Sequence, residues 1–451
     1  MGHTTKSTAE LRAAVSGVLS SVRADLEDLV RIPSVSADPA RAPDVRRCAE
    51  ATAKLFEDEG FDDVQILSSD GGAPAVVARK PGPPGAPTVL LYAHHDVQPV
   101  GRLEDWDSDP FEPTERGERL YGRGAADDKA GIAAHLAAVR AHGGNPPVGV
   151  TVFVEGEEEV GSPSLAAFLD EHVNLLRADV IVIADSTNWD IGVPALTTSL
   201  RGLVDVFVEV STLEHGVHSG LWGGVAPDAL TALVRLLATL HDDQGNVAVQ
   251  GLVSGPVADI DYPEDRVRAE TAMLDGVEFI GSGSLVERLW TKPAIATIGL
   301  DATSTADASN TLIPSATAKV SLRIAPGDSA GSAQNKLVEH LKAHVPWGAK
   351  LEVTPGRSNG EPSVITAEGP AYDAARAAFR EAWDGTDPVD MGIGGSIPFI
   401  AAFQEAFPEA AVLVTGVEDP DTRAHGVNEG LHLGEFERVC LAEALLLANL
   451  A

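Results

Sequence analysis

Cysteine is scarce in this chain, because only Cys48 and Cys440 occur among its 451 residues. Neither belongs to a Cys-x-x-Cys pair, which disfavours a disulfide framework and a thiolate zinc site, and we assign neither cysteine a role. The amino-terminal stretch MGHTTKSTAELRAAVSG lacks the apolar core of a signal peptide. No run approaches the ~18 apolar residues of a membrane span. These absences favour a cytoplasmic protein without membrane contact.

Positive charge is also in short supply, since 33 Lys and Arg face 67 Asp and Glu and give a net charge of −34. Such a field repels nucleic acid and anionic membranes, so we exclude both as partners. The acidity either serves solubility alone or includes carboxylates gathered around a cation. The hydrophobic fraction of 44% is typical of a globular protein. The length exceeds what one ordinary core accommodates, so we expect two domains.

Apolar runs alternate with helix-type segments through the first 200 residues. The predicted strands are Thr88–Tyr92, Val148–Val154 and Asp179–Ala184, and the predicted helices are Thr8–Leu29, Pro43–Glu59, Lys129–Ala141 and Ser162–Leu176. This alternation predicts an α/β fold, in which a mainly parallel sheet is covered by helices on both faces. From about Arg357 the chain returns to buried runs such as Ala411–Val414, which we expect to rejoin this sheet.

The middle of the chain has a different pattern. Leu203–Val210 alternates in polarity like a half-exposed strand. Further elements are predicted as strands at Ile295–Leu300, Ala316–Ile324 and Leu351–Thr354 and as helices at Asp228–His241 and Gln334–His344. We therefore predict an inserted α+β domain with a four-stranded sheet, one face of which is open to solvent. The predicted boundaries place the catalytic domain at 1–197 and 357–451 and the inserted domain at 198–356.

Polar residues follow the ends of the predicted strands of the main sheet. They are two imidazoles and several carboxylates, namely His94, Asp96, Glu157, Glu158, Glu159, Asp185 and, in a later loop, His425. In open α/β sheets ligands bind beyond the carboxyl ends of the strands, where these side chains could converge. Imidazole and carboxylate without thiolate suit a divalent metal such as zinc, manganese or cobalt.

Two acidic segments of the chain, GEEEVGS and the Asp127-Asp128 pair, can each be interpreted as catalytic or as merely structural. Adjacent Glu158 and Glu159 could divide the work, with Glu159 binding metal and Glu158 acting as a general base on an activated water. Alternatively, GEEEVGS only caps a helix that begins near Ser162, because acids are favoured at helix amino termini. Likewise, Asp127 and Asp128 in YGRGAADDKAG could simply begin the following helix. The residues alone leave both alternatives open.

Taken in order along the chain, five motifs resemble those of the M20 metallopeptidase family, especially its dipeptidase and carnosinase-like branch. They are AHHDVQP, GRGAADDKAG, EGEEEVGS, IADSTNW and AHGVNEG. The resemblance implies a two-metal hydrolase in which Glu158 is the general base and Asp96 orients a ligand. It implies that one metal takes His94, Asp127 and Asp185, and that the other takes Asp127, Glu159 and His425.

The inserted domain also has counterparts in this family, where it serves as a lid and a dimerisation domain. GVHSGLWGG resembles the segment whose histidine, here His218, reaches the partner subunit's site and steadies the oxyanion. Asn310 and Arg323 resemble residues that hold the substrate, and Gly395 and Ser396 resemble the glycine-rich loop that receives its carboxyl end. Strand alternation independently places Arg323 on an open face, where it either grips a carboxylate or is merely solvated. Relatives commonly carry Arg-Glu just before GGSIP, whereas Gly392 and Ile393 stand there in this chain.

The resulting prediction is a homodimeric hydrolase with two divalent ions per subunit, zinc or else manganese or cobalt, that cleaves the peptide bond of dipeptides. An N-acyl-amino-acid deacylase or carbamoylase on the same scaffold is the alternative, because these enzymes differ in the pocket for the substrate's amino end. A catalytically silent binder of metal or peptide is a third reading, which Glu158 disfavours because a binder needs no base.

Overall fold

The computed structural model describes residues 6–255, 260–395 and 397–451. The chain forms two compact units: unit 1 comprises Met1–Thr198, Ile365–Met391 and Pro398–Ala451, and unit 2 comprises Ser199–Val364 and Gly392–Ile397. The predicted domain boundaries at 197/198 and 356/357 stay a prediction. The compact unit 2 begins at Ser199, extends to Val364 and also includes Gly392–Ile397, whereas the predicted inserted domain spans 198–356.

The largest sheet is mixed and has the strand order β1-β2-β6-β3-β7-β17-β8-β15, in which β16 also pairs with β8. Its strands belong to unit 1 except for β15 and the last residues of β8 and β16. The β6–β3, β3–β7 and β7–β17 pairs at its centre are parallel, as predicted. The strands are β1 (Asp63–Leu67), β2 (Ala75–Lys80), β3 (Thr88–His94), β6 (Gly149–Glu155), β7 (Val180–Ile183), β8 (Ala195–Leu200), β15 (Ser363–Val364), β16 (Val389–Ile393) and β17 (Ala411–Val414). A separate small sheet contains β4 (Thr114–Arg116), β5 (Arg119–Tyr121) and β18 (Gly430–His432).

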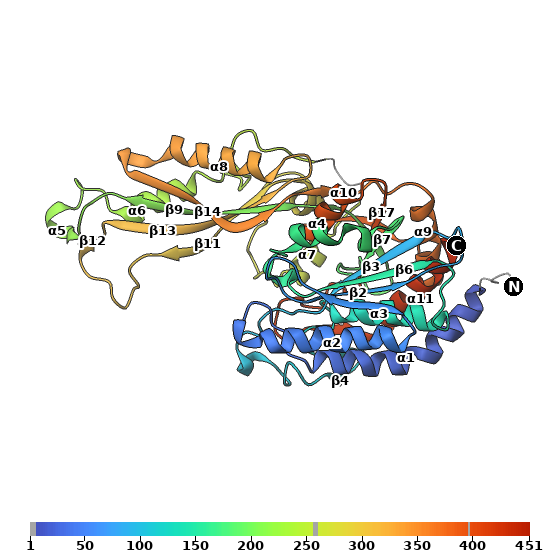
Figure 1. Cartoon of the computed structure of the whole chain (residues 1–451). Coiled ribbons are helices and arrows are strands. Elements are labelled where there is room, and N and C mark those ends of the chain that lie inside the picture. Colours follow the sequence, from blue (N-terminus) through green and yellow to red (C-terminus); the bar gives the residue numbers. More distant parts are fainter. Residues whose placement is uncertain (1–5, 256–259, 396) are drawn as a thin grey trace. The chain divides into compact units, whose positions relative to one another are not determined.

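Helices cover both faces of this sheet, which confirms the predicted layers. In Figure 1, α4 and α10 lie above the strands, whereas α1, α2 and α3 lie below them. The helices of unit 1 are α1 (Thr8–Val30), α2 (Ala42–Asp58), α3 (Lys129–Ala141), α4 (Leu165–Leu176), α9 (Pro370–Ala382), α10 (Pro398–Ala406) and α11 (Leu433–Asn449). Helix α3 packs between β3, α1 and α11, and nearly all of its residues are therefore buried.

The parallel register brings the strand ends to one edge. His94 at the end of β3 is paired with Glu155 at the end of β6, and Tyr92 is paired with Ile183 at the end of β7. The ring of Tyr92 stacks on Phe399 of α10, and Phe153 of β6 packs beside them. These buried aromatic side chains pack close to the ends of β3 and β6. The loops after β3, β6 and β7 leave the sheet at that same edge, and they carry the polar motifs.

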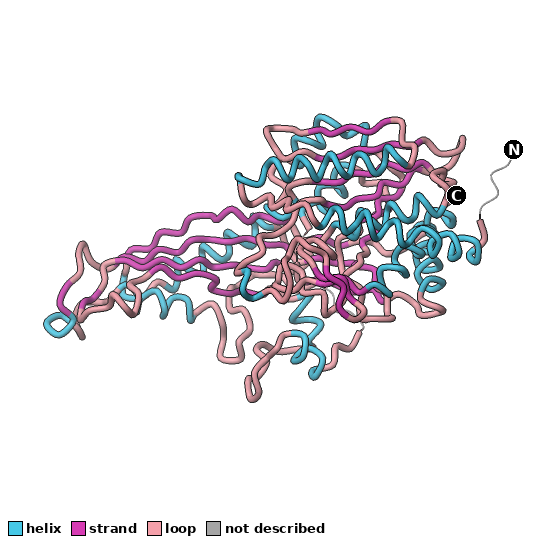
Figure 2. The backbone as a smooth tube through the Cα atoms, turned by 90° about the horizontal axis from the view of Figure 1, so that it is seen from below, coloured by secondary structure: helices cyan, strands magenta, loops and turns pink. Residues whose placement is uncertain are grey.

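Unit 2 contains the four-stranded antiparallel sheet β11-β13-β9-β14, whose strands run side by side in Figure 2. One face buries valines and leucines against α6 and α8, whereas the residues between them alternate outward along β13. This alternation confirms the predicted half-open sheet. The elements are β9 (Gly202–Ser211), β10 (Val217–His218), β11 (Ala294–Asp301), β12 (Thr311–Leu312), β13 (Ser315–Ile324), β14 (Lys350–Gly360), α5 (Ser219–Trp222), α6 (Ala229–Ala238), α7 (Glu264–Glu270) and α8 (Ala330–His344).

In the part of the chain that the structure describes, every helix is too short or too polar to cross a membrane. Cys48 and Cys440 are both free thiols and both buried. The thiol of Cys48 lies 3.5 Å from the carbonyl oxygen of His95.

Candidate metal centre

His94 and Asp127 form the first contact of a cluster in unit 1. His94 ends β3, and Asp127 lies in the loop before α3, to which it is joined through Asp128 by a cis peptide bond. The Nε2 atom of His94 lies 3.1 Å from Oδ1 of Asp127 and 3.8 Å from Oδ1 of Asp185. These are the three residues that the sequence assigns to one metal.

The second carboxylate oxygen of Asp127 faces a different histidine. Nε2 of His425 lies 3.1 Å from Oδ2 of Asp127 and 3.3 Å from Oε2 of Glu159. Asp127, Glu159 and His425 have ligand atoms within 4.8 Å of one another, and so do His94, Glu158 and Asp185. Because Asp127 offers one oxygen to each histidine, its carboxylate has the geometry of a bridge between two adjacent cation sites.

Asp96 orients His94, although not with its carboxylate alone. Nδ1 of His94 lies 3.0 Å from the backbone oxygen of Asp96, and Oδ1 of Asp96 is at 3.5 Å. A carbonyl acceptor requires Nδ1 to carry the proton, which leaves the Nε2 lone pair free for a metal. The Asp96 carboxylate instead accepts the backbone N–H groups of Glu158 and Glu159, each at 3.2 Å. One residue thus positions groups of both predicted metal sites.

The three consecutive glutamates after β6 divide their roles. Glu157 accepts the backbone N–H of Ser164 at 2.7 Å and that of Ala73 at 2.9 Å. It therefore ties the turn before α4 to a neighbouring loop, as the capping alternative required. Glu158 and Glu159 form the short turn beyond it and face His94, Asp185 and His425. The capping interpretation holds for Glu157 and not for its two neighbours.

Asp128 is the amino-terminal cap residue of α3, yet its side chain forms no capping hydrogen bond. Its Oδ2 atom instead accepts the backbone N–H of His94 at 3.2 Å. Asp127 faces the two histidines, so this aspartate pair contributes to the cluster and not only to the start of the helix.

Negative charge is concentrated at this place. Burial and then the Asp185 and Glu159 carboxylates raise the pKa of Glu158 well above its ordinary value. Contacts with the carboxylates of Asp127 and Glu159 raise the pKa of His425 to about 11. Glu418, in the loop after β17, also has a raised pKa, because it is buried near Asp127 and Asp185. Carboxylates brought this close repel one another unless positive charge lies among them.

Orphaned polar atoms show that the residues fit a metal. Several buried side-chain atoms among the described residues have no hydrogen-bond partner, and three of them belong to this cluster: Nε2 of His94, Oε1 of Glu159 and Oδ1 of Asp128. Such atoms are costly unless something satisfies them. The set of two imidazoles and several carboxylates is the donor chemistry of zinc, manganese or cobalt. The cluster therefore has the form of a two-metal centre.

Backbone strain marks the loop that carries His425. Arg423, His425 and Asn428 have positive φ angles of 59°, 62° and 58°. Non-glycine residues rarely adopt this left-handed conformation, and it is found most often where a side chain must be held in a particular place. His425 is 61% exposed, so solvent reaches this side of the centre.

Sequence reasoning missed two residues that hold the predicted ligands. Gln98, in the motif AHHDVQP, donates from Nε2 to Oε2 of Glu159 at 2.7 Å. Glu429, in the motif AHGVNEG, accepts the backbone N–H groups of Ala126 and Asp127 at 3.0 and 3.1 Å. Nη1 of Arg123 forms an ion pair with Oε2 of Glu429 at 2.6 Å. Both residues stand inside motifs already recognised, so their position in the sequence was the available signal.

The remaining predicted site residues belong to unit 2. His218 is exposed, and its Nδ1 accepts the backbone N–H of Gly220 at 3.0 Å. Asn310 lies beside it, since its backbone oxygen accepts the N–H of Ser219 at 2.9 Å. Arg323 projects from β13 and Gly395 lies in the segment after β16. Ser396 lies outside the described residues.

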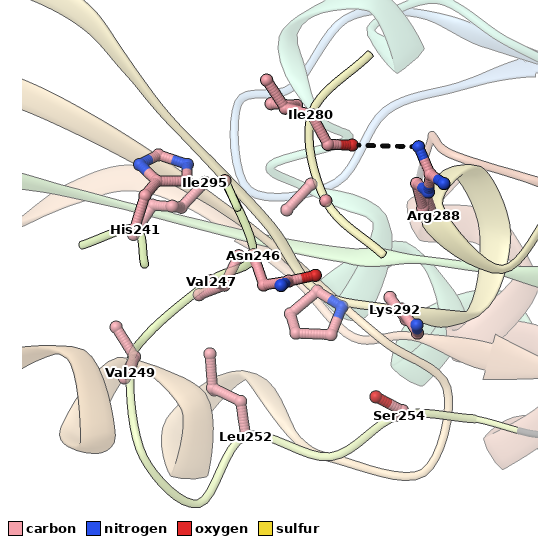
Figure 3. A pocket seen from close by; sticks show the side chains of 14 residues that line it. His241, Asn246, Val247, Val249, Leu252, Ser254, Ile280, Arg288, Lys292 and Ile295 are labelled. Carbon is pink, nitrogen blue, oxygen red and sulfur yellow. Dashed lines mark hydrogen bonds between the residues drawn. The ribbon is translucent and has the colours of Figure 1, made fainter. Parts of the chain in front are cut away.

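A cavity of about 300 Å³ in unit 2 contains none of the predicted site residues that the structure describes. Its cationic lining is already satisfied: Arg288 donates to the carbonyl of Ile280 at 3.2 Å, as Figure 3 shows, and Lys292 donates to that of Ser282 at 2.7 Å. No carboxylate or thiol lines this cavity, so it lacks the donor set of the cluster in unit 1.

The chain is similar to known proteins in sequence and in fold. Residues 90–449 match the model of peptidase family M20/M25/M40. The chain is 37% identical to the cysteinylglycine-S-conjugate dipeptidase of Corynebacterium striatum, with 93% of each chain covered. It is 29% identical to the human Beta-Ala-His dipeptidase over 80% of this chain and 74% of that one. The structure of the dipeptidase Dug1p from Saccharomyces cerevisiae superposes with a TM-score of 0.85 at 24% identity, covering 99% of both chains.

Proposed function

The chain belongs to peptidase family M20/M25/M40, and from that membership we propose that it is a metal-dependent dipeptidase that uses a two-metal centre in unit 1. The observation that carries this proposal is the position of Asp127, which offers one carboxylate oxygen to His94 and the other to His425. The relatives from Corynebacterium striatum and human are both named as dipeptidases. Zinc is the proposed native metal, and the cytoplasm is the proposed location.

Each ion has a proposed set of ligands. His94, Asp127 and Asp185 hold one ion, and Asp127, Glu159 and His425 hold the other. When bound, a pair of divalent ions polarises the substrate carbonyl and lowers the pKa of water. Asp96 keeps the proton of His94 on Nδ1, and Gln98 holds one oxygen of Glu159.

Glu158 is the proposed general base. It faces His94 and Asp185 in the cluster, and burial together with neighbouring carboxylates raises its pKa. A carboxyl group with a raised pKa is a better proton acceptor when ionised. Glu158 takes the proton of the attacking water and then delivers it to the leaving amine, so that the amine departs neutral.

Residues of unit 2 are proposed to hold the substrate. Arg323, Asn310, Gly395 and Ser396 receive its free carboxyl end. His218 stabilises the oxyanion in the site of a second subunit. Its Nδ1 accepts a backbone N–H, which places its proton on Nε2 as a donor suited to that task.

The proposed homodimer has support in the segment that follows His218. Leu221, Trp222 and Val225 are 74%, 55% and 88% exposed. Large apolar side chains that gather on a surface commonly mark a site of protein association. A dimer formed here would cover them and place His218 next to a partner subunit.

The test is a panel of substrates for the purified, zinc-loaded protein. Cys-Gly and β-Ala-His are the dipeptides named by the relatives, and their N-acetylated forms probe the alternative. We expect release of free amino acids from at least one unmodified dipeptide, and turnover at least about tenfold lower on its acetylated form. Cleavage of the acetylated forms alone would move the protein to the deacylases. Binding of dipeptide without any cleavage would identify it as a binder.

A further inference from the structure

Two arginines of unit 2 lie close together. Arg323 in β13 is paired with Leu203 of β9 and with Ala294 of β11. Arg201 directly precedes β9, and its Nη1 reaches the carbonyl of Lys292, two residues before Ala294, at 3.4 Å. Burial lowers the pKa of Arg201 to about 10, and the charge of Arg323 acts in the same direction. Both guanidinium groups are therefore charged at neutral pH and near each other.

Neither guanidinium forms an ion pair within the described ranges, 6–255, 260–395 and 397–451. Arg201 is 8% exposed, and it makes only long hydrogen bonds to neutral oxygens: Nη1 reaches the carbonyls of Arg288 and Lys292 at 3.3 and 3.4 Å. Lys319, on the same face of β13 as Arg323, is paired with Asp205 at 2.6 Å. Holding the buried guanidinium of Arg201 beside a second cation without an anion is unfavourable. In a chain with 67 acidic residues, an unneutralised pair indicates that the anion is a ligand.

Two residues of the glycine-rich stretch after β16, Ile393 and Gly394, contact Arg201. The backbone N–H of Arg201 donates to the carbonyl of Ile393 at 3.3 Å, and its Nε reaches that of Gly394 at 3.4 Å. A Cβ atom at Gly394 would lie 2.6 Å from Nη2 of Arg201, so a side chain there would displace the guanidinium. The absence of a side chain at Gly394 thus leaves the guanidinium of Arg201 in its observed place.

We propose that Arg201 is a further specificity-determining residue, which together with Arg323 forms a two-guanidinium site for the free carboxylate of the dipeptide. This inference rests on the proposed dipeptidase function and adds to it a residue that the sequence motifs did not contain. Two planar guanidinium groups offer a carboxylate more N–H donors than one arginine can. A carboxamide is neutral and therefore accepts these hydrogen bonds less well than a carboxylate does. The site therefore selects dipeptides with an unblocked carboxyl end.

The experiment compares Cys-Gly with its carboxyl-terminal amide in the zinc-loaded wild type and in Arg201→Met, Arg201→Lys and Arg268→Met. Arg268 is a matched control, because it lies in α7 of the same unit and pairs with Glu264 on the helix surface. A charge-assisted hydrogen bond contributes about 10- to 100-fold to affinity. We expect Arg201→Met to raise KM for Cys-Gly by about that factor, with a smaller change in kcat and little change for the amide.

Arg201→Lys keeps the charge without the fork, so its preference for the acid is expected to lie between those of the wild type and Arg201→Met. Binding of an Ala-Gly analogue with CH2–NH in place of the peptide bond, as acid and as amide, is followed by calorimetry. This measurement tests Arg201 even if no dipeptide is cleaved, an outcome that would reject only the proposed function. Loss of the preference for the acid in Arg201→Met alone supports the inference. A folded Arg201→Met with the wild-type preference, or equal weakening of acid and amide, overturns it.

Discussion

The proposed metal centre depends on Asp127, because one of its carboxylate oxygens faces His94 and the other faces His425. These two histidines belong to the first and the last of the five sequence motifs. Three other residues nearby are not among the proposed ligands and instead hold those ligands in place. Gln98 fixes Glu159, Asp96 fixes His94, and Glu429 holds the backbone of Asp127. Such supporting contacts commonly change metal affinity by about 10- to 100-fold when they are removed.

Gln98→Met tests this support at the residue scale. The substitution keeps the length of the side chain and removes the amide that donates to Glu159. We expect zinc affinity of one of the two sites to fall about 10- to 100-fold, measured by competition with a chelator at constant pH. Gln334→Met in α8 is the control and should leave both affinities unchanged. Two wild-type affinities in Gln98→Met would contradict the assigned role.

Seven side chains of unit 1 are proposed as ligands or catalytic groups from the sequence. Six of them stood out as imidazoles or carboxylates after strand ends or in a later loop, whereas Asp127 was assigned by the resemblance to the M20 family. Sequence reasoning did not identify Gln98 or Glu429, because their place inside the motifs was a signal of importance but the group that each one holds is known only from the structure. Arg201 was also missed. Its importance depends on Arg323, more than one hundred positions away, and on a strand register that sequence patterns do not fix.

At the scale of elements, α3 and α11 are joined by a buried ion pair. Nδ1 of His135 lies 2.8 and 2.9 Å from the two carboxylate oxygens of Glu443, and Nε2 lies 2.9 Å from the carbonyl of Tyr92 in β3. All three partners are acceptors, so both ring nitrogens must donate and the ring is an imidazolium. Burial alone would lower the pKa of His135, but the Glu443 carboxylate reverses this and the pKa is raised.

Glu443→Gln should therefore destabilise the protein, and the effect should depend on pH. Breaking one partner of a buried pair costs about 3–5 kcal/mol. Because the folded pKa of His135 is raised, the stabilisation is fully present below its unfolded pKa of about 6.5 and is lost as pH rises through the folded value. Urea unfolding at several pH values should show the difference between wild type and variant shrinking above pH 6.5. A difference that grows with pH would contradict the imidazolium.

Elements were predicted best where packing and local preference agree. Lys129–Ala141 and Ala411–Val414 have the predicted bounds, because each is an apolar run with clear stops. The helix expected from Ser162 begins instead at Leu165, since Glu157 takes up the backbone N–H of Ser164. The helix expected to reach His241 ends at Ala238. Helix ends depend on such individual contacts, which periodicity does not reveal.

At the scale of the whole molecule, the proposed dimer depends on the apolar residues that follow His218. Trp222→Glu should convert the dimer to a monomer near the chain mass of 47.0 kDa, because a buried charge at an interface is unfavourable. Sedimentation velocity measures the change, and activity should fall with it while zinc content is retained. Leu274→Glu is the control, since Leu274 is 76% exposed in the same unit. A fully active Trp222→Glu monomer would remove the role assigned to His218.

The central claim is that two ions and Glu158 together cleave a dipeptide. The most direct measurement strips the protein of metal, adds zinc in steps, and records bound zinc and Cys-Gly hydrolysis in the same samples. We predict that activity reappears with binding and reaches its maximum at two ions per chain. Glu158→Ala should bind the same two ions with turnover lower by about 10²- to 10⁴-fold. Full activity without metal, or near-normal turnover by Glu158→Ala, would contradict the account.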